Sequence, residues 1–245
     1  MDFSLGLKTD AGPRQENQDT ILAILPDGWP DAALLVVADG MGGAKGGARA
    51  SQEAVTVIRH AILEGEPVDQ DQAAERLHQA IIQANQAVHA ISQTSPDMEG
   101  MGCTVVAVLV LGDRYWVASV GDSRAYLIRN GVGVQLTTDH TWVGQQVRNG
   151  ILTSEQAAHH SLRHVLERAL GAEQTVEVDV WPENRLEPGD VLLLCTDGLY
   201  GVLEETVLIS LATTYSPQQA ADRLVAQALR AATRDNVSVI LLRAD

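Results

Sequence analysis

The sequence predicts an α+β fold in which antiparallel sheets carry helices on their outer faces. Apolar runs of strand length cluster near both ends of the 245-residue chain and in its middle, and short turns join neighbouring runs. Longer segments with helical periodicity lie between these clusters. Because parallel strands need long crossovers, strands joined by short turns favour layered antiparallel sheets over a strictly alternating parallel fold.

The first half of the chain is predicted to hold two strands, two helices and three further strands. Apolar residues recur three and four positions apart over 48–63 and 72–92, which predicts two amphipathic helices. Asn130-Gly131, just after the last of these strands, is a strong signal for a hairpin turn. The strands are expected at 22–25, 33–38, 104–111, 115–120 and 125–128.

The second half is predicted to hold a polar helical segment over 141–170, two strands, a helix and a final strand. Pro217 suits the first turn of that helix, which is expected over 217–232. The strands are expected at 176–180, 191–195 and 237–242. No repeat, low-complexity tract or long linker divides the chain, so we expect a single domain over 1–245.

Composition and charge argue against several classes of protein. The net charge is −15 and aromatic residues make up 4% of the chain, so nucleic acid and anionic membranes are poor partners. No apolar run is long enough to span a bilayer, and the N-terminus has no basic segment followed by an apolar one, as a secretory signal would. Cys103 and Cys195 lie in apolar runs, which is typical of buried thiols in a reducing compartment, so we expect a cytoplasmic protein. The acidity either serves solubility or marks clusters that hold cations.

Aspartates stand where apolar runs end or begin, and they are spread over the whole chain. A carboxylate at the end of a buried run needs a cation, and a neighbouring glycine lets the backbone approach a ligand closely. Carboxylates, backbone carbonyls and water suit hard ions such as Mg²⁺ or Mn²⁺. A single Asp-Gly step is more often a turn, and spacing alone does not show that distant acids converge. The aspartates in question are Asp19, Asp39, Asp122, Asp197 and Asp235.

Arg14 adds a second chemistry next to the first of these acids. It lies five residues before Asp19. An arginine there can form a salt bridge with an acid, or its planar guanidinium can bind a phosphate through two hydrogen bonds. Spacing alone leaves both interpretations open.

Seven segments taken together resemble those of the protein phosphatase 2C family, the metal-dependent serine/threonine phosphatases. They occur in the family's order and at its usual separations and cover essentially the whole chain, although no single segment is specific. The resemblance implies a central antiparallel β-sandwich flanked by α-helices on both sides, a four-layer αββα arrangement with metals in a channel at one end. The segments are "RQENQD" (14–19), "VVADGMGG" (36–43), "GCTVVAVLV" (102–110), "VGDSRAYL" (120–127), "TTDHT" (137–141), "LLLCTDGL" (192–199) and "RDNVSVILL" (234–242).

The resemblance implies a site for two Mg²⁺ or Mn²⁺ ions, and for a third ion that is often found in bacterial members. By residue match, Asp39 would bridge the two ions and the carbonyl of Gly40 would complete one of them. Asp197 and Asp235 would hold the other. Asp122 would hold the third ion together with Asp197.

Further residues of the matched segments would act around these ions. Arg14 would bind the substrate phosphate, and Asp19 would orient metal-bound water. Asp139, His140 and Asn236 would support the site without touching the ions.

The resemblance also implies a mechanism. Two close ions would lower the pKa of a shared water that attacks phosphorus in line, so no covalent phosphoenzyme is needed. No basic loop that could cradle a phosphate follows Cys195, which is interpreted as a core residue. Met41 stands where eukaryotic members carry a histidine acid, so the leaving group would take its proton from metal-bound water. Ala44 and Ala48 replace a histidine and a glutamate of the bacterial pattern, neither of which is a metal ligand.

The implied substrates are phosphorylated proteins, and the implied partner is a cognate serine/threonine kinase acting on the same targets. A monomer is the default. In this family the segment 141–170 forms a mobile flap near the channel, and its polar side chains lead us to expect that it selects protein substrates.

Three alternatives have distinct sequence marks. A non-catalytic member acting as a regulatory binding module would lack one or more metal acids. A phosphatase dedicated to one anti-sigma antagonist would usually lack some of the motifs or carry sensor domains. A structural calcium-binding protein would show the spacing of a calcium loop, which is missing here.

Overall fold

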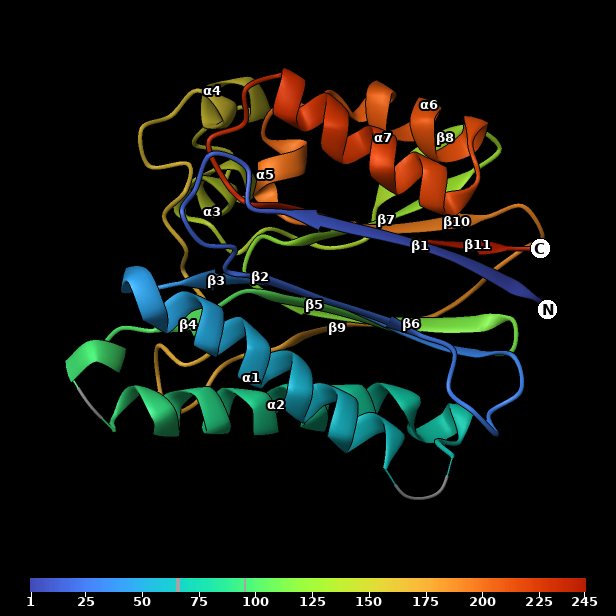
Figure 1. Cartoon of the computed structure of the whole chain (residues 1–245), viewed down its shortest axis with the longest axis horizontal. Coiled ribbons are helices and arrows are strands. Elements are labelled where there is room, and N and C mark those ends of the chain that lie inside the picture. Colours follow the sequence, from blue (N-terminus) through green and yellow to red (C-terminus); the bar gives the residue numbers. More distant parts are fainter. Residues whose placement is uncertain (65–66, 95) are drawn as a thin grey trace.

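Two antiparallel β-sheets pack face to face, and helices cover the outer face of each sheet, in the computed structural model of this chain (Figure 1). The structure describes residues 1–64, 67–94 and 96–245, and the side chains of 43–45 lie outside that description. The layers run helix, sheet, sheet, helix, which confirms the predicted α+β sandwich with helices on both sides.

The first sheet joins the two ends of the chain. Its strand order is β1-β11-β10-β7-β8, and β1 pairs with β11 along its whole length, so that the termini lie side by side (Figure 1). The β7–β8 hairpin turns at Asn130 and Gly131, whose φ angles of 54° and 76° are those of the predicted tight turn. The strands are β1 (Phe3–Asp10), β7 (Arg124–Arg129), β8 (Val132–Gln135), β10 (Val191–Cys195) and β11 (Val237–Ala244).

The second sheet has the order β2-β3-β5-β6-β9, with the short β4 paired to β3. The inner strand β3 is buried on both faces, because Leu34 and Val36 face the helices while Leu35 and Val37 face the other sheet. Burial on both faces explains why this stretch of sequence is apolar without interruption. The strands are β2 (Asp19–Ile24), β3 (Ala32–Met41), β4 (Gly102–Cys103), β5 (Val105–Leu111), β6 (Arg114–Val120) and β9 (Asp179–Arg185).

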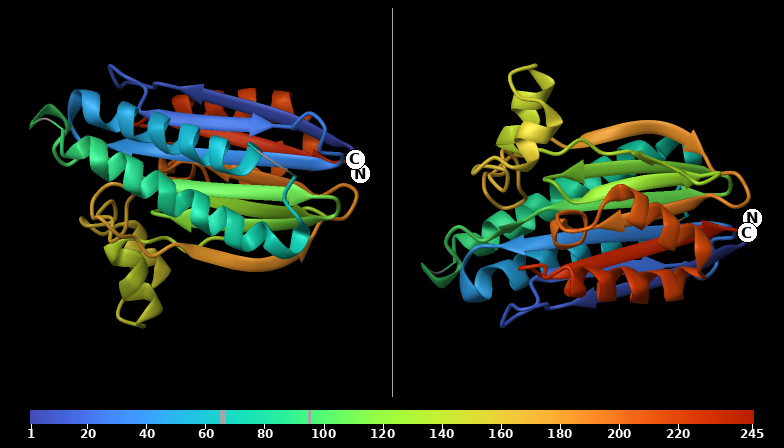
Figure 2. Two further views of the ribbon diagram at one scale, coloured as in Figure 1. Left: turned by 90° about the horizontal axis from the view of Figure 1, so that it is seen from below. Right: turned by 90° about the horizontal axis from the view of Figure 1, so that it is seen from above.

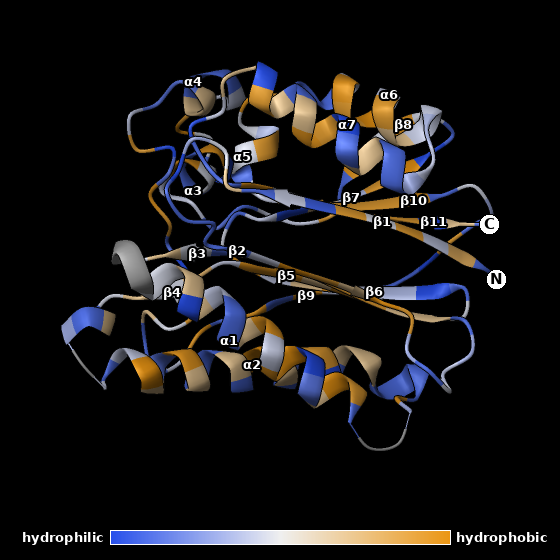
Figure 3. Cartoon of the chain, in the orientation of Figure 1, coloured by the Kyte–Doolittle hydropathy of each residue, from blue (hydrophilic) through white to orange (hydrophobic). Residues whose placement is uncertain are grey.

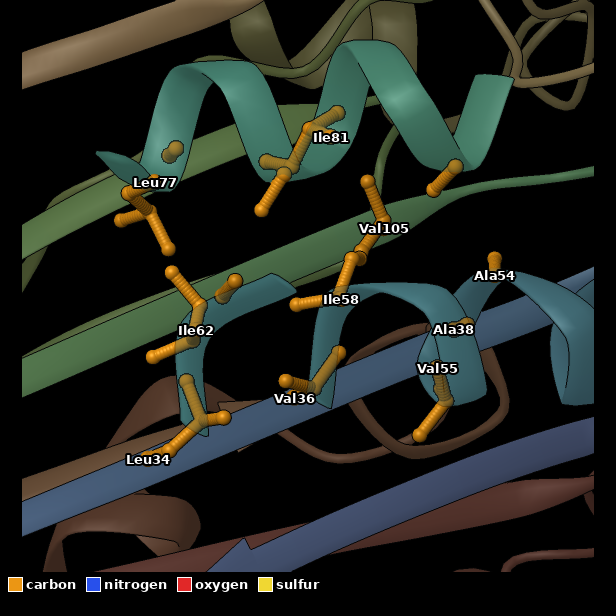
Figure 4. Close-up of a cluster of buried hydrophobic side chains, with 14 of the residues drawn as sticks. Leu34, Val36, Ala38, Ala54, Val55, Ile58, Ile62, Leu77, Ile81 and Val105 are labelled. Atoms are coloured by element: carbon orange, nitrogen blue, oxygen red, sulfur yellow. The ribbon is translucent and has the colours of Figure 1, made fainter. Parts of the chain in front are cut away.

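Helices α1 and α2 cover the second sheet, and α6 and α7 cover the first (Figure 1). Figure 4 shows Ile58 and Ile62 of α1 meeting Leu77 and Ile81 of α2 above Leu34 of β3. Burial of each such side chain stabilises the fold by about 1.5–3 kcal/mol. Figure 3 shows hydrophobic and hydrophilic residues mixed along α1, α2 and α7. The helices are α1 (Gly43–Leu63), α2 (Ala73–Ser92), α3 (Trp142–Arg148), α4 (Ser154–Ala158), α5 (Asp197–Tyr200), α6 (Glu205–Thr214) and α7 (Pro217–Arg230), with 3₁₀ turns at Gln70–Gln72 and Pro96–Met98.

The segment 141–170 is the main departure from the predicted elements. A helical segment was expected throughout, but only α3 and α4 are helical, and turns and irregular chain occupy the rest. Gly150, at φ +70°, follows α3, and a capping box at Thr153 starts α4 afresh. Both helices project beside one end of the sandwich (Figure 2).

Two edge strands also differ from the expectation. The strand expected at 176–180 begins instead at Asp179 and continues to Arg185, where its last four residues are exposed and polar. No strand was expected at β1, although its first six residues alternate between apolar side chains and Ser, Gly or Lys. The exposed end of β9 has no buried face, so its sequence shows no hydrophobic alternation.

No helix in the described part of the chain is both long enough and apolar enough to cross a bilayer.

Candidate metal centre

The five aspartates that flank apolar runs in the sequence, four of them predicted metal ligands and Asp19 predicted to orient metal-bound water, come together at one end of the sandwich, near α3 and α4 (Figure 1). The strand register brings them there. Cys195 pairs with both Arg124 and Val239, so the segments holding Asp122, Asp197 and Asp235 reach the same edge of the first sheet. Asp19 and Asp39 are direct partners on β2 and β3 of the second sheet.

The carboxylates are close enough to perturb one another. Burial first, and then the charges of Asp19, Asp197, Asp122 and Asp235, raise the pKa of Asp39 well above its usual range. All four partners therefore surround Asp39, although they come from different parts of the chain. Such a group of buried like charges is costly unless a cation neutralises it.

The other acids of the group show the same effect. Burial, with smaller effects from the charges of Asp197 and Asp235, raises the pKa of Asp19 to about 7. The hydrogen bonds that Asp19 accepts act in the opposite direction. Burial, followed by the charge of Asp197, raises the pKa of Asp122 to about 7. Burial also raises the pKa of Asp235.

Two buried carboxylate oxygens have no hydrogen-bond partner in the described structure, Oδ1 of Asp19 and Oδ1 of Asp197. A buried oxygen without a donor is expected to have one from water or from an ion. No three Asp, Glu, His or Cys side chains among the described residues are arranged to hold an ion unaided. Mg²⁺ usually keeps several waters and takes one or two carboxylates, so these oxygen donors fit Mg²⁺ or Mn²⁺.

Asp19 is held so that only one of its oxygens is available. Oδ2 accepts hydrogen bonds from Thr196 Oγ1 (3.0 Å), directly after β10, and from Ser238 Oγ (2.7 Å), the second residue of β11. Oδ1 is the buried oxygen without a donor. Asp19 can therefore accept a proton or a hydrogen bond from a water at the centre of the cluster.

Gly40 is required by the close approach of two other segments. A Cβ at this position would lie 2.1 Å from the carbonyl oxygen of Gly47 in α1 and 2.6 Å from that of Gln18. The Gly40 amide donates to the Gln18 carbonyl at 3.1 Å. The glycine thus lets α1 and the loop before β2 pack directly against the strand that carries Asp39.

Arg14 lies at the rim of the cluster and is more than half exposed. Its Nη2 donates to Oδ2 of Asp235 at 2.8 Å, and its Nε donates to the carbonyl of Arg234 at 2.8 Å. Asn236 fastens this loop, because its side-chain amide donates to the carbonyls of Ala11 and Glu16 at 2.9 Å each. The structure thus places Arg14 and Asn236 beside Asp235.

Asp139 is linked to Asp122 of the cluster through two other side chains. Its carboxylate accepts hydrogen bonds from Nε and Nη2 of Arg124, the shortest of them 2.7 Å. The Arg124 guanidinium lies 3.6 Å from the ring centroid of Tyr200, and the Tyr200 hydroxyl donates to the carbonyl of Asp122 at 2.9 Å. Sequence reasoning missed Arg124 and Tyr200, which follow Asp122 and Asp197 by two and three residues.

His140 contacts the residue before Asp122. Its Nδ1 accepts from the amide of Gly121 at 3.1 Å, and its own amide donates to the Gly121 carbonyl at 2.9 Å. Its Nε2 lies 3.1 Å from Oδ2 of Asp179. Burial lowers the pKa of His140, although Asp179 acts in the opposite direction.

The segment 141–170 reaches the cluster through His164. Nδ1 of His164 lies 3.5 Å from Oδ2 of Asp197, and this contact raises the pKa of His164. In the same segment the ring centroids of Trp142 and His160 lie 5.0 Å apart. Of the two replaced positions of the bacterial pattern, Ala48 lies half-buried in α1, and the side chain of Ala44 lies outside the described residues.

Comparison with known proteins gives one consistent family. The family model for Protein phosphatase 2C matches residues 13–238. The serine/threonine phosphatase stp of Listeria monocytogenes serotype 4b is 36% identical over 214 residues, which are 86% of this chain and 84% of that protein. The serine/threonine protein phosphatase PstP of Mycobacterium tuberculosis is 35% identical over 228 residues, which are 93% of this chain but only 42% of PstP.

Solved structures agree with this result. The S. agalactiae serine/threonine phosphatase superposes with a TM-score of 0.92 at 31% identity over 100% of both chains. The catalytic domain of PstP in complex with two manganese ions superposes with a TM-score of 0.87 at 32% identity over 99% of both chains. The chain therefore belongs to the protein phosphatase 2C family.

Proposed function

We propose that this protein hydrolyses phosphoserine and phosphothreonine esters in proteins, using water activated by Mg²⁺ or Mn²⁺ and no covalent phosphoenzyme. The observation that carries the proposal is the grouping of Asp19, Asp122, Asp197 and Asp235 around Asp39, which raises the pKa of Asp39. The relatives named as serine/threonine phosphatases and the two manganese ions in the PstP catalytic domain support it.

The proposed ligands divide the cluster into three ion positions. Asp39 would bind both principal ions, one with the carbonyl of Gly40 and the other with Asp197 and Asp235. Asp122 and Asp197 would bind a third. When bound, such ions lower the pKa of water and withdraw charge from phosphoryl oxygens.

The chain's own residues would then position the reactants. Asp19 would orient the attacking water through Oδ1, because Thr196 and Ser238 occupy Oδ2. Arg14 would bind the phosphate with the part of its guanidinium that Asp235 does not use. Met41 has no proton to donate, so the leaving oxygen would take its proton from water.

Burial of the thiols supports a mechanism without a cysteine nucleophile. Cys195 is fully buried, and burial raises the pKa of its thiol to about 12. Cys103 is also fully buried, and burial raises its pKa as well. A thiolate is the nucleophilic form, so neither residue is suited to attack phosphorus.

Hydrolysis of p-nitrophenyl phosphate with Mn²⁺, with and without a chelator, tests the proposal. We expect activity that the chelator abolishes and near-complete loss in Asp39→Ala and Asp197→Ala. Phosphoserine, phosphothreonine and phosphotyrosine peptides compared at equal concentration would then define the substrate class. Wild-type protein that binds phosphopeptides but hydrolyses none would instead support a regulatory binding module.

The substrates, the partner and the location of the protein are proposed from the same family relationship. Phosphorylated proteins would be the substrates, a cognate serine/threonine kinase would act on the same targets, and the protein would work as a monomer in the cytoplasm. The flap at 141–170 would select among substrates, because His164 brings it to the proposed metal ligand Asp197. Grafting another member's flap should change the preference among phosphoproteins, and an unchanged preference would reject this role.

A further inference from the structure

His140 occupies the junction between the proposed metal ligand Asp122 and the flap. The Gly121 N–H donates to the imidazole Nδ1 of His140 (3.1 Å), and the Gly121 carbonyl accepts from the His140 amide (2.9 Å). The side chain is almost fully buried. A single residue therefore holds the backbone immediately before Asp122.

Gly121 has little freedom to adapt if that support is lost. Its φ is +99°, and a Cβ there would lie 2.6 Å from Cγ2 of Thr104. Thr104 itself binds the strand of Asp39, since its Oγ1 accepts from the Asp39 amide at 3.1 Å and lies 2.7 Å from Ser123 Oγ. The segment around Asp122 is thus clamped between Thr104 and His140.

The hydrogen bonds also define the ring tautomer of His140. An amide N–H can only donate, so Nδ1 facing Gly121 must be an acceptor, and Nε2 of the neutral ring carries the proton. That proton points to Oδ2 of Asp179 (3.1 Å). Nη1 of Arg168, at 3.4 Å from Nε2, is also a donor and therefore binds Oδ1 of Asp179 instead (2.8 Å).

The same residue is bonded to the flap. The His140 carbonyl accepts from the amide of Glu167 at 2.8 Å, and Arg168 ties the flap to Asp179. The amide of Trp142, two residues after His140, donates to the carbonyl of Val165 at 2.8 Å. This hydrogen bond joins the two ends of the flap. Movement of the flap and movement of Gly121 are thus linked through one buried residue, which bonds Gly121 by its imidazole and amide and the flap by its carbonyl.

We propose that His140, oriented by Asp179, is a positioning residue that couples the flap to the ion site at Asp122. The inference rests on the proposed function, because it takes Asp122 as a metal ligand. Partners that orient a ligand without touching the ion typically change metal affinity 10- to 100-fold when removed. His140 acts on the backbone of the ligand's segment, and Asp179 acts on the ring of His140.

Binding of Mn²⁺, measured by calorimetry and by the electron paramagnetic resonance signal of the free ion, tests the proposal without an activity assay. The binding step lost in Asp122→Asn identifies the ion at Asp122. We expect His140→Gln and Asp179→Ala to weaken that step by about tenfold or more and to leave the other steps unchanged. His140→Asn should stay close to wild type, because the asparagine oxygen can replace Nδ1 as acceptor for Gly121.

Asn85→Ala is the matched control for lost stability. Asn85 is also buried and also holds backbone, accepting from the Gly171 amide (2.8 Å) and donating to the carbonyls of Glu173 and Gln174 (3.2 Å each), but it does not contact Asp122 or Gly121. It should lose thermal stability and keep wild-type Mn²⁺ affinity. Hydrogen exchange of 141–170 should slow on addition of Mn²⁺ in wild type and Asn85→Ala, but not in His140→Gln.

Two results would overturn the inference in distinguishable ways. If His140→Gln and Asp179→Ala bind Mn²⁺ at the Asp122 step as wild type does, His140 only supports the fold and the proposed function stands. If Asp122→Asn itself loses no binding step, the proposed ligand assignment fails, and the coupling fails with it.

Discussion

Asp19 and Asp39 are directly paired across β2 and β3, which places two carboxylates on one rung of an antiparallel ladder. Directly paired residues have Cα atoms about 4.5–5.5 Å apart, and like charges in such a pair destabilise the sheet. The two acids are also buried or half-buried and have three further aspartates nearby. In the metal-free protein this pair therefore opposes folding, and a bound cation would relieve the repulsion.

Removal of one carboxylate should make the metal-free protein more stable and the enzyme inactive. Asp39→Asn relieves repulsion from Asp19, Asp122, Asp197 and Asp235, so urea unfolding in chelator at pH 8 should show a gain of about 1 kcal/mol, the usual size for such changes at active sites. The same variant should lose hydrolysis of p-nitrophenyl phosphate and the stabilisation that Mn²⁺ gives wild type.

Asp190→Asn is the control for this prediction. Asp190 is buried as well, but Arg129 donates to both of its oxygens (2.9 and 2.6 Å) and the Glu187 amide donates to Oδ2 (2.7 Å). This variant should lose about 1–3 kcal/mol. A loss of stability in Asp39→Asn of similar size would mean that the acids do not repel one another in the metal-free state.

The contribution of His140 to stability should fall in mildly acidic solution. Burial lowers its pKa below the usual 6.5, while Asp179 favours the charged ring and Arg168 and Arg148 oppose it. The neutral ring is therefore the form that the folded state prefers. Its contribution is fully present above about pH 6.5 and is lost as the pH falls below that value, because the unfolded chain then binds more protons.

The measurement is urea unfolding between pH 5 and pH 7.5 in wild type and His140→Asn, which cannot titrate at this position. The difference in free energy of unfolding should narrow as the pH falls. A constant difference over this range would show that the ring does not change its protonation state there.

The acids of the site could be predicted from the sequence because each one ends or begins a buried apolar run. Their convergence could not be derived from spacing, since it depends on strand register, such as Cys195 pairing with both Arg124 and Val239. The family resemblance supplied that missing step. Arg124 and Tyr200 escaped prediction because stacking and a bond to the Asp122 carbonyl leave no mark in the local sequence.

The core strands and the long helices could also be predicted from their apolar patterns. The strand β9 and the segment 141–170 could not. β3 and α1 bury wide apolar surfaces, and their periodicity is strong. β9 ends in exposed residues, and the segment 141–170 is held by contacts with His140, Cys103 and Asp197 from outside the segment. Non-local bonds of this kind override local propensity without leaving a periodic pattern.

Loss of Arg14 should weaken substrate binding more than turnover. Its bonds to Asp235 and to the Arg234 carbonyl orient the guanidinium, while Nη1 makes no hydrogen bond to the described residues. A charged hydrogen bond contributes about 1.5–3 kcal/mol, so Arg14→Ala should raise KM for a phosphopeptide by about 10- to 100-fold with little change in kcat. Arg14→Lys should recover only part of the loss, because an ammonium cannot keep both orienting bonds.

Arg185→Ala removes the same charge elsewhere and serves as its control. Arg185 is similarly exposed and pairs with a single carboxylate, Asp113, at 2.7 Å. We expect wild-type kinetics. A fall in kcat for Arg14→Ala with unchanged KM would argue against a role in holding the phosphate.

The contact between His164 and Asp197 should restrain the flap in the metal-free protein. The imidazole is well exposed and its Nδ1 lies 3.5 Å from the carboxylate, so the contact is worth about 0.5–1 kcal/mol at most. His164→Ala should therefore speed hydrogen exchange in 141–170 by about two- to fivefold in chelator. His159→Ala, a change at another exposed histidine of the same segment, should leave the exchange rates unaltered.

Because a divalent ion would compete for the same Asp197 oxygen, the difference between wild type and His164→Ala should disappear in saturating Mn²⁺. Equal exchange rates for wild type and His164→Ala in chelator would show that the flap is held by its two ends alone.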